Sequence, residues 1–282
     1  MGEMSFKEML KDASNRNFAV GAFNIFNYIS AKAVMDAAQS LCAPVIIQTS
    51  TSTVRQFGSG SLIDMLNILR KNRPNPILIH LDHCTSIDLA KECIDCGWDS
   101  VMIDLSAKRL EENMEGTIEV KQYAQRKHVD VESELGIISG TEDDIHHKVE
   151  NQPKYEDAVS YLEKVKVDAF APAIGTAHGV YEKAAEINYE LIRQLRQGIE
   201  TPIVIHGGTG LSTEQFKELI DAGGSKINIS TALKQAYYSA IRGFLSEYPN
   251  EKNPLKLDAV AEHAIYQVAQ EHIKCFRSDG KC

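Results

Sequence analysis

The sequence alternates regularly between short apolar runs and longer amphipathic segments, and this feature constrains the fold more than any other. Between the runs, apolar residues recur at the spacing of a buried helix face, as at Ala31, Val34, Met35 and Ala38. Strands that alternate with helices form a parallel sheet, and eight such units predict a closed (β/α)8 barrel, the TIM barrel. The predicted strands are Phe18–Phe23, Val45–Thr49, Ile77–Leu81, Ser100–Asp104, Asp130–Glu134, Asp168–Ala173, Pro202–His206 and Ser225–Ile229.

The chain continues well beyond the last predicted strand. Residues 231–275 have the pattern of two or more helices, which is more than one outer helix of a barrel needs. We therefore expect a helical C-terminal extension over about 231–282. Because no segment rich in proline, glycine or serine interrupts the sequence, we expect a single barrel domain over residues 1–282.

The composition argues against several classes of partner. The 282 residues include 39 acidic and 30 basic side chains, which gives a formal net charge of −9. Such a surface repels phosphate backbones and anionic lipids, so no nucleic acid and no membrane is expected as a partner. No apolar run approaches the ~18 residues of a membrane span, and the N-terminus lacks the pattern of a secretory signal. The scattered cysteines 42, 84, 93, 96, 275 and 282 are therefore predicted to be reduced thiols of a cytoplasmic protein.

Polar residues follow several predicted strands at the point where each strand ends. In a (β/α)8 barrel these ends meet at one rim, and catalytic groups lie there. Histidines follow the third, sixth and seventh strands, at His83, His178 and His206. A single histidine at such a place is an ordinary hydrogen-bonded side chain as often as it is a metal ligand. Three imidazoles at one rim favour a Zn²⁺ site with an open position for water or substrate. The other candidates at this rim are Asn24, Ser50, Asp82, Asp104, Ser106, Glu134, Asn228, Ser230 and Thr231.

Two segments near the seventh and eighth strands have the composition of anion sites. Gly207–Gly210 follows the seventh strand, and Asn228–Thr231 opens the helix after the eighth. The N–H groups of a glycine turn and of a helix N-terminus bind phosphate without the help of a lysine. Because the phosphate sites of such barrels lie between these two strands, the pair of segments predicts a phosphate-binding site.

Seven segments, in order and over nearly the whole chain, match one known family. They are Leu81–His83, Val101–Asp104, Val131–Gly136, Thr141–Asp144, Ala173–Gly179, His206–Gly210 and Lys226–Asn228. In these segments the chain resembles the class II, zinc-dependent ketose-bisphosphate aldolases, and the fructose- and tagatose-bisphosphate enzymes are the most similar members. The resemblance implies a TIM barrel that cleaves a sugar phosphate.

The resemblance also implies a metal site. His83, His178 and His206 would bind one catalytic Zn²⁺ per subunit, and the site could take a second or a monovalent cation. Asp104 and Glu134 would stabilise an alternative position of the metal or orient its ligands. A bound Zn²⁺ can stabilise, as a Lewis acid, the enediolate that cleavage of a C3–C4 bond leaves.

Two further carboxylates would move protons. Asp82 would exchange the proton of the C4 hydroxyl, and Glu142, on a mobile loop, the proton at C3 of the dihydroxyacetone phosphate (DHAP) unit. Two proton transfers at different atoms make two such groups a natural requirement, although either residue alone could be a loop cap or a solvated carboxylate. The residues that would hold the C1 phosphate are Gly179, Gly207, Thr209, Asn228, Ser230 and Thr231, and the rim residues Asn24 and Ser50 complete the predicted substrate-binding set.

The predicted function is the reversible cleavage of a ketose (bis)phosphate, such as fructose or tagatose 1,6-bisphosphate, into DHAP and an aldehyde. No lysine follows a strand where a Schiff base would need one, and the metal route replaces it. We expect a homodimer or a homotetramer. Three alternatives stay open: a zinc-dependent sugar-phosphate isomerase or epimerase, an aldolase of a ketose 1-phosphate, and a non-catalytic sugar-phosphate-binding barrel.

Two departures from the family concern phosphate recognition. Many members carry a phosphate-facing lysine where Glu182 stands here, with Lys183 one place later. The family's Asp-Pro-Arg, whose arginine reaches the distal phosphate across a dimer interface, is Asn253–Leu255 in this chain. Lys256 or Lys252 could take the place of the arginine, but a lysine is a mobile point charge and not a planar fork. We therefore expect weaker discrimination between a 1,6-bisphosphate and a 1-phosphate.

Overall fold

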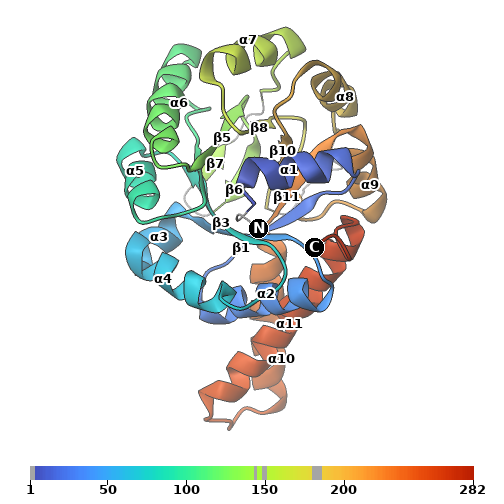
Figure 1. Cartoon of the computed structure of the whole chain (residues 1–282). Coiled ribbons are helices and arrows are strands. Elements are labelled where there is room, and N and C mark those ends of the chain that lie inside the picture. The colour runs from blue at the N-terminus through green and yellow to red at the C-terminus, as the bar shows by residue number, and fades with distance from the viewer. Residues whose placement is uncertain (1–3, 143–144, 148–150, 180–185) are drawn as a thin grey trace.

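The computed structural model describes residues 4–142, 145–147, 151–179 and 186–282, and leaves out the side chains of residues 141, 142 and 145–147. A closed barrel forms with the strand order β1-β11-β10-β8-β5-β4-β3-β2, and neighbouring strands are parallel (Figure 1). Each predicted run overlaps one of these strands, which confirms the predicted (β/α)8 barrel. The strands are β1 (Val20–Asn24), β2 (Val45–Ser50), β3 (Ile77–Cys84), β4 (Ser100–Ile103), β5 (Asp130–Leu135), β8 (Ala169–Pro172), β10 (Ile203–Ile205) and β11 (Gly224–Ile229).

Helices surround the barrel and cover the outward-facing side chains of its strands (Figure 1). Four of these helices, α2, α5, α8 and α9, begin with a side-chain cap; Ser212, for example, caps α9 and exchanges hydrogen bonds with Gln215 in a capping box. The apolar helix faces and the outward strand residues form the larger of two core clusters. These helices are α2 (Tyr28–Ser40), α3 (Thr51–Phe57), α4 (Ser59–Arg70), α5 (Ile87–Asp95), α6 (Leu110–Gln125), α7 (Tyr155–Val165), α8 (Tyr189–Gly198) and α9 (Thr213–Ala222).

A helix before the first strand, α1 (Phe6–Asn15), closes the N-terminal end of the barrel. It is not among the predicted elements, although Phe6, Met9 and Leu10 have the spacing of a helix face. These side chains pack on the inward-facing apolar residues of the strands and form the second core cluster with them. The strand residues in this cluster are Val20, Ala22, Ile46, Leu78, Ala169, Ala171 and Val204.

A small sheet that the sequence analysis does not predict lies outside the barrel. Its strands are β6 (Ser139–Glu142), β7 (Ile145–His147) and β9 (Ala177–His178), in the order β7-β6-β9. In the β6–β9 pair, Gly140 stands opposite His178. Gly140 has a φ of 107°, and a Cβ there would lie 2.2 Å from the carbonyl oxygen of His178, so only glycine fits.

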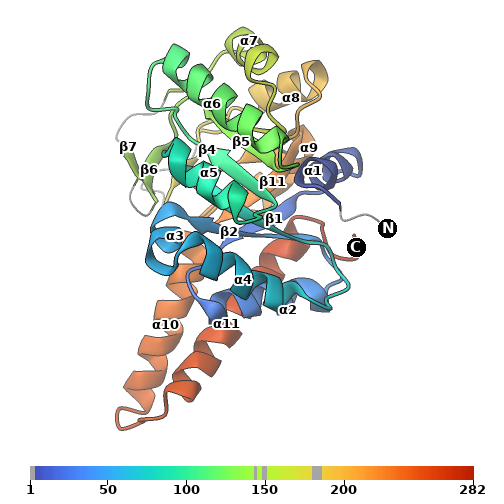
Figure 2. The ribbon, with the colours of Figure 1, turned by 60° about the vertical axis from the view of Figure 1, so that its left-hand side comes forward.

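The C-terminal part of the chain forms a helical arm, which we define as α10 (Thr231–Glu247), α11 (Pro254–Cys275) and the turn between them. The free end of the arm projects from the barrel (Figure 2). Helix α11 packs on α2 and buries Ile265 and Ile273, whereas α10 fully buries only Leu233. The arm therefore exposes large apolar side chains, namely Tyr238, Leu245, Tyr248 and Leu255.

The tail after α11 returns to the loop between α2 and β2. The backbone N–H of Gly280 donates to the carbonyl of Leu41 at 2.8 Å, and that of Cys282 to Cys42 at 3.1 Å. Cys42 and Cys282 form a disulfide. The prediction of six reduced thiols is therefore wrong for these two residues, because a sequence separation of 240 hides their proximity. The thiols of Cys84, Cys93, Cys96 and Cys275 are free.

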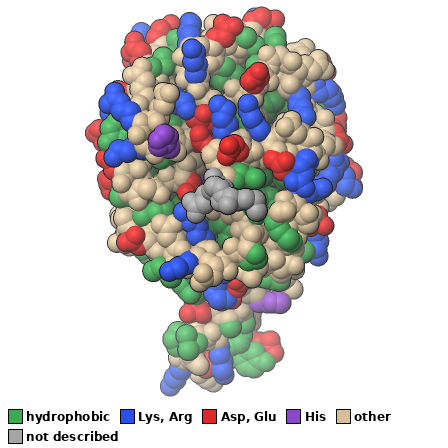
Figure 3. All heavy atoms as spheres, viewed as in Figure 1, with side chains coloured by type: hydrophobic (Ala, Val, Ile, Leu, Met, Phe, Trp, Pro, Cys, Tyr) green, Lys and Arg blue, Asp and Glu red, His purple; other side chains and the backbone are tan. Residues whose placement is uncertain are grey.

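Charges of both signs are mixed on the surface. Figure 3 shows Lys, Arg, Asp and Glu side chains interspersed over the face seen in Figure 1, with hydrophobic side chains exposed near the end of the arm. No helix in the described part of the chain has the length and apolar character needed to cross a bilayer.

Candidate metal and active site

The three predicted histidines meet at the C-terminal rim of the barrel. His83 lies on β3, His206 directly follows β10, and His178 lies on β9 of the small sheet. His83 Nε2 is 2.7 Å from His206 Nδ1, and the ring centroids of His83 and His178 are 4.8 Å apart. All three side chains are buried, and the nitrogens that could bind a metal lie within 4.8 Å of one another. Three imidazoles in this arrangement fit the donor set of a zinc ion.

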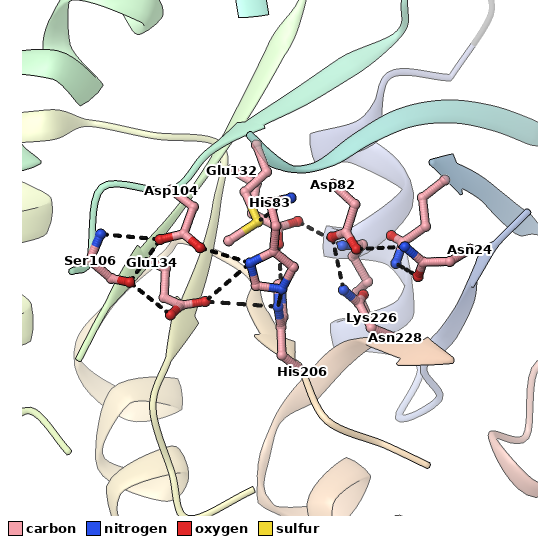
Figure 4. Close-up of polar contacts among 12 residues, drawn as sticks. Asn24, Asp82, His83, Asp104, Ser106, Glu132, Glu134, His206, Lys226 and Asn228 are labelled. Carbon is pink, nitrogen blue, oxygen red and sulfur yellow. Dashed lines mark hydrogen bonds and ion pairs between the residues drawn. The ribbon is translucent and has the colours of Figure 1, made fainter. Parts of the chain in front are cut away.

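The backbone at His83 departs from regular strand geometry. Its φ is 45°, in the left-handed region that residues other than glycine rarely adopt, and the β3–β4 register shifts between Leu81 and Cys84. In a regular strand Asp82 and His83 would point to opposite faces. Here both side chains take part in the site, as Figure 4 shows. Such irregularities concentrate at functional sites because they re-aim side chains.

Two carboxylates surround the outer side of His83. Asp104 Oδ2 lies 2.8 Å from His83 Nδ1, and the Ser106 hydroxyl lies 2.7 Å from Asp104 Oδ1 and 3.1 Å from Glu134 Oε1, so its one hydrogen is shared between the two carboxylates. Glu134 Oε2 lies 3.9 Å from His83 Nδ1 and 3.8 Å from His206 Nδ1. This oxygen is buried without a hydrogen-bond partner, so it is a second feature that a cation would satisfy. His83, Asp104 and Glu134 form a second possible ligand set beside the three histidines.

The pKa values of His83, Glu134 and His206 are shifted by burial and by the charges that surround them. Burial alone would lower the pKa of His83, but Asp82, Asp104 and Glu134 reverse this effect and raise its pKa well above its ordinary value. Burial and the charge of Asp104 raise the pKa of Glu134 well above the usual range. Burial and the neighbouring His83 lower the pKa of His206. A bound cation would neutralise the excess negative charge, so the residues present fit a metal ion.

Amide groups from two strands clamp Asp82. Asn24 on β1 donates to Asp82 Oδ2 at 2.8 Å, and Asn228 on β11 donates to Asp82 Oδ1 at 3.1 Å. Gln48 on β2 donates to the side-chain oxygen of Asn24 at 2.6 Å and so fixes its orientation. Each oxygen of Asp82 accepts one N–H, which sets the plane of the carboxylate beside His83 (Figure 4).

The predicted phosphate segments lie side by side. Gly207 has a φ of 70°, and a Cβ on Gly208 would lie 2.7 Å from the carbonyl oxygen of Asn228, so the two segments approach closely because glycine stands there. The hydroxyl of Thr209 accepts from the N–H of Ala232 in the first turn of α10. The Ser230 hydroxyl, at the N-cap of α10, is buried without a hydrogen-bond partner. A glycine turn beside a helix N-terminus with an unpaired hydroxyl suits an anion.

The remaining predicted residues lie nearby or outside the described part. Ser50 ends β2, and its hydroxyl lies 2.9 Å from that of Ser52. Thr231 begins α10, and Gly179, with a φ of 88°, directly follows His178. The side chain of Glu142 is not described, although its backbone belongs to β6. Glu182 and Lys183 also lie outside the described residues.

The sequence analysis misses a buried polar layer that contains Gln48, Glu132 and Lys226. All three face the barrel interior, one step below the rim residues of the same strands. The missed signal is a polar residue two positions before a predicted site residue, as in Glu132 before Glu134 and Lys226 before Asn228. Ser106 is among the residues predicted at the rim but has no predicted role, although its hydroxyl contacts both Asp104 and Glu134.

Comparison with known proteins gives matches over the whole chain. The fructose-bisphosphate aldolase class-II family matches residues 4–281. A fructose-bisphosphate aldolase of Geobacillus stearothermophilus is 36% identical over 284 residues, which cover 100% of this chain and 99% of that protein. The structure of the YdjI aldolase from Escherichia coli K12 has a TM-score of 0.86 at 29% identity and covers 99% of both chains. A putative fructose-1,6-bisphosphate aldolase from Coccidioides immitis has a TM-score of 0.92 at 23% identity, covers 100% of this chain and 99% of that one, and shows the shared fold.

These matches define an aldolase, a lyase that cleaves carbon–carbon bonds, and they favour this activity over the isomerase, epimerase and non-catalytic alternatives. The chain belongs to the class II fructose-bisphosphate aldolase family. Members of this family are generally metal-dependent, and the buried cluster of histidines and carboxylates could bind a metal.

Proposed function

We propose that this aldolase uses zinc and reversibly cleaves a ketose (bis)phosphate, such as fructose or tagatose 1,6-bisphosphate, into DHAP and an aldehyde. The observation that carries the proposal is the position of the clamped Asp82 beside the convergent histidines His83, His178 and His206. A buried carboxylate beside a buried cation site suits the proton transfer at the C4 oxygen and the charge stabilisation of a retro-aldol cleavage.

In this proposal His83, His178 and His206 hold the zinc, and Asp104 and Glu134 orient these ligands or stabilise an alternative position of the ion. When bound, zinc would act as a Lewis acid on the oxygen where negative charge develops. The hydrogen bond between Asp104 and His83 Nδ1 leaves His83 Nε2 directed toward His206 and supports this assignment. The partnerless Oε2 of Glu134 supports a second position of a cation close to both rings.

Asp82 would accept the proton of the C4 hydroxyl as the C3–C4 bond breaks and the aldehyde forms. The amide groups of Asn24 and Asn228 hold its carboxylate in one plane, so the proton acceptor is oriented before substrate arrives. In the direction of synthesis the same group returns the proton to the aldehyde oxygen. Orientation by neutral donors leaves the carboxylate free to take up and release that proton.

Glu142 would supply the proton at C3 of the DHAP unit. Its strand, β6, pairs with β9, and in this pair Gly140 of β6 stands opposite His178 of β9. The backbone of Glu142 is therefore two residues along the chain from the residue that pairs with His178. This register supports the assignment of the second carboxylate to the rim. Because C3 and the C4 oxygen are different atoms, Asp82 and Glu142 would act in separate steps.

The C1 phosphate would lie between the ends of β10 and β11. The buried, unpaired hydroxyl of Ser230 and the close approach of the glycine segment to β11 support this position. A helix N-terminus adds favourable interaction with an anion there, since α10 begins at Thr231. The proposed binding residues are Gly179, Gly207, Thr209, Asn228, Ser230 and Thr231, with Asn24 and Ser50 binding the rest of the substrate.

The helical arm supports a homodimer or homotetramer as the working form. It exposes Tyr238, Leu245, Tyr248 and Leu255, and Leu255 is 71% exposed. Lys256, the cation next to Leu255, forms an ion pair with Glu251, so its charge is already partly compensated. We therefore propose that the enzyme discriminates weakly between a 1,6-bisphosphate and a 1-phosphate. With fructose 1,6-bisphosphate as a substrate, the enzyme would serve glycolysis in the cytoplasm.

A panel of ketose mono- and bisphosphates, scored by DHAP release with zinc present, tests the proposal. We expect turnover of a ketose (bis)phosphate, with kcat/KM values for fructose 1,6-bisphosphate and fructose 1-phosphate closer together than in Leu255→Arg. A complete absence of DHAP from every member of the panel would contradict the proposal. A wild-type preference for the bisphosphate of several orders of magnitude, unchanged in Leu255→Arg, would contradict the weak discrimination alone.

A further inference from the structure

A buried ion pair lies directly beneath the histidine cluster. Glu132 on β5 and Lys226 on β11 are both 0% exposed, and Lys226 Nζ lies 2.9 Å from Glu132 Oε2. The other oxygen of Glu132, Oε1, lies 2.8 Å from His206 Nε2 (Figure 4). A fully buried ion pair is costly to desolvate and adds little stability, so its presence here calls for another role.

We propose that Glu132 and Lys226 are positioning residues, which hold the His206 ring with Nδ1 directed at the metal position. This inference rests on the proposed function, in which His206 is a zinc ligand. Glu132 would act on the ring, and Lys226 would act on Glu132. Neither residue would touch the metal or the substrate.

The hydrogen-bond chemistry of Glu132 fixes which nitrogen of His206 can bind a cation. An ionised carboxylate only accepts hydrogen bonds, so the Nε2 of His206 carries the hydrogen and donates it to Glu132. The lone pair of the ring is then on Nδ1, which lies 2.7 Å from His83 Nε2 on the inner side of the cluster. A metal-binding histidine commonly has such a carboxylate behind it, because that partner fixes the tautomer and the ring orientation.

The second arm of the network holds Glu132 itself. Lys226 engages Oε2 and leaves Oε1 to His206, so the two oxygens have separate partners. Packed rings form a floor beside this pair: the ring of Phe6 stacks on His80 at 5.0 Å between centroids, and Lys226 Nζ lies 5.9 Å from the Phe6 centroid. His80 is anchored in turn to Ser100 at 2.8 Å. This floor restricts the movement of Lys226 and therefore of Glu132.

A comparison with the other histidine–carboxylate pair supports a role in positioning. His83 Nδ1 meets Asp104, whose second oxygen accepts from a neutral hydroxyl, that of Ser106. His206 Nε2 meets Glu132, whose second oxygen meets a cation. Two rings from opposite parts of the barrel are thus each backed by an anchored carboxylate, and their remaining nitrogens face each other.

The test compares zinc binding in wild type, Glu132→Gln and Lys226→Met. Glutamine has the shape of glutamate but can turn its N–H₂ toward Nε2, which moves the ring hydrogen to Nδ1 and blocks the metal-binding nitrogen. We expect the zinc dissociation constant, from competition with a chromogenic chelator at fixed pH, to rise about 10–100-fold in Glu132→Gln. A smaller rise is expected in Lys226→Met. The Co²⁺-loaded variants should show altered ligand-field absorption.

A matched control separates positioning from a purely structural role. Asp168 is also a buried carboxylate with lysine partners, Lys7 and Lys121, but it lies before β8 at the opposite end of the barrel. Asp168→Asn should lower the melting temperature and leave zinc affinity and the Co²⁺ spectrum unchanged. If Lys226→Met fails to fold, the double variant Glu132→Gln/Lys226→Met removes both charges together and should still show the weaker zinc binding.

The outcomes distinguish this inference from the proposed function. His206→Ala, measured in parallel, should lose most of its zinc affinity. Wild-type affinity in His206→Ala would overturn the ligand assignment on which the inference rests. Weak binding in His206→Ala, together with wild-type affinity and Co²⁺ spectrum in folded Glu132→Gln, would overturn the positioning role alone.

Discussion

The two ends of the barrel interior are built from the same strands but from opposite kinds of side chain. Toward the N-terminal end, inward-facing residues such as Ala22, Ile46 and Leu78 pack on α1. Two residues further along the same strands, the inward-facing positions are Asn24, Gln48 and His80, and polar groups continue from there to the rim. The inward-facing side chains change from apolar to polar within two residues of each strand. One layer of the barrel interior therefore serves packing, and the layer above it holds the groups of the site.

This difference has an energetic basis. A buried aliphatic side chain contributes about 1.5–3 kcal/mol, and the lower layer consists of such groups. The upper layer buries Asp82, Asp104, Glu132 and Glu134, whose desolvation opposes folding unless partners compensate it. Changes at the two ends should therefore have opposite signatures: loss of stability at the lower end, and loss of metal binding or turnover at the upper end.

The largest effect should follow removal of a proposed zinc ligand. His178→Ala should lose bound zinc and nearly all turnover while the far-UV circular dichroism stays that of the wild type, because the rim is separate from the core. Elemental analysis after gel filtration gives the zinc content, and DHAP release gives the turnover. An unfolded His178→Ala protein would break the comparison between the two ends.

The two proposed proton-transfer groups should each cost about 10²–10⁴-fold in kcat, since this is the usual contribution of general acid–base catalysis. Asp82→Ala should block cleavage and leave exchange of the C3 proton of DHAP with deuterated water largely intact. Glu142→Ala should slow that exchange. Equal loss of exchange in both variants, followed by nuclear magnetic resonance, would contradict the division of roles.

At the lower end, Leu10→Ala should reduce the free energy of unfolding by about 2–5 kcal/mol, because Leu10 is fully buried in the cluster that closes the barrel. The kcat of the folded variant should stay close to that of the wild type. Urea unfolding and steady-state kinetics measure the two quantities. A fall in kcat comparable to that of Asp82→Ala would show that the two ends are not separable.

The smallest effect on the site should come from the disulfide, which ties the tail to the loop before β2, far from the rim. Cys42→Ser should lower the free energy of unfolding by about 2–4 kcal/mol, because a closed loop between distant residues restricts the unfolded chain. Cys282→Ser should cost the same, and the double variant no more than either. An unfolding curve that reducing agent leaves unchanged would contradict a stabilising role for this link.

The strands were predictable because a short run of β-branched and apolar residues indicates a strand without reference to the rest of the chain. Runs such as Val45–Thr49 combine β-branched residues with the preceding Pro44, and their spacing specifies the barrel without knowledge of any contact. The approach of His83 and His206 also followed, since parallel strands bring their ends to one rim, whereas His178 reaches that rim from β9 of the small sheet. The small sheet did not, because β6 and β7 are short and mostly polar and lack a strand-like hydrophobic pattern.

Other features depend on contacts that no local pattern encodes. The left-handed backbone of His83 cannot be read from a strand pattern, which would separate it from Asp82. The disulfide joins residues 240 positions apart. Lys226 and Glu132 look like exposed positions of their strands, because charged residues are almost never fully buried unless paired, and the partners are on different strands.

The most direct test of the zinc-dependent cleavage proposed for this site is a zinc titration of metal-free protein. The readout is DHAP release from a ketose phosphate that the enzyme cleaves in the substrate panel. We predict no turnover without metal and a linear recovery that saturates at one zinc per chain, with elemental analysis confirming both states. Turnover at the full rate in protein shown to be metal-free would contradict the proposal.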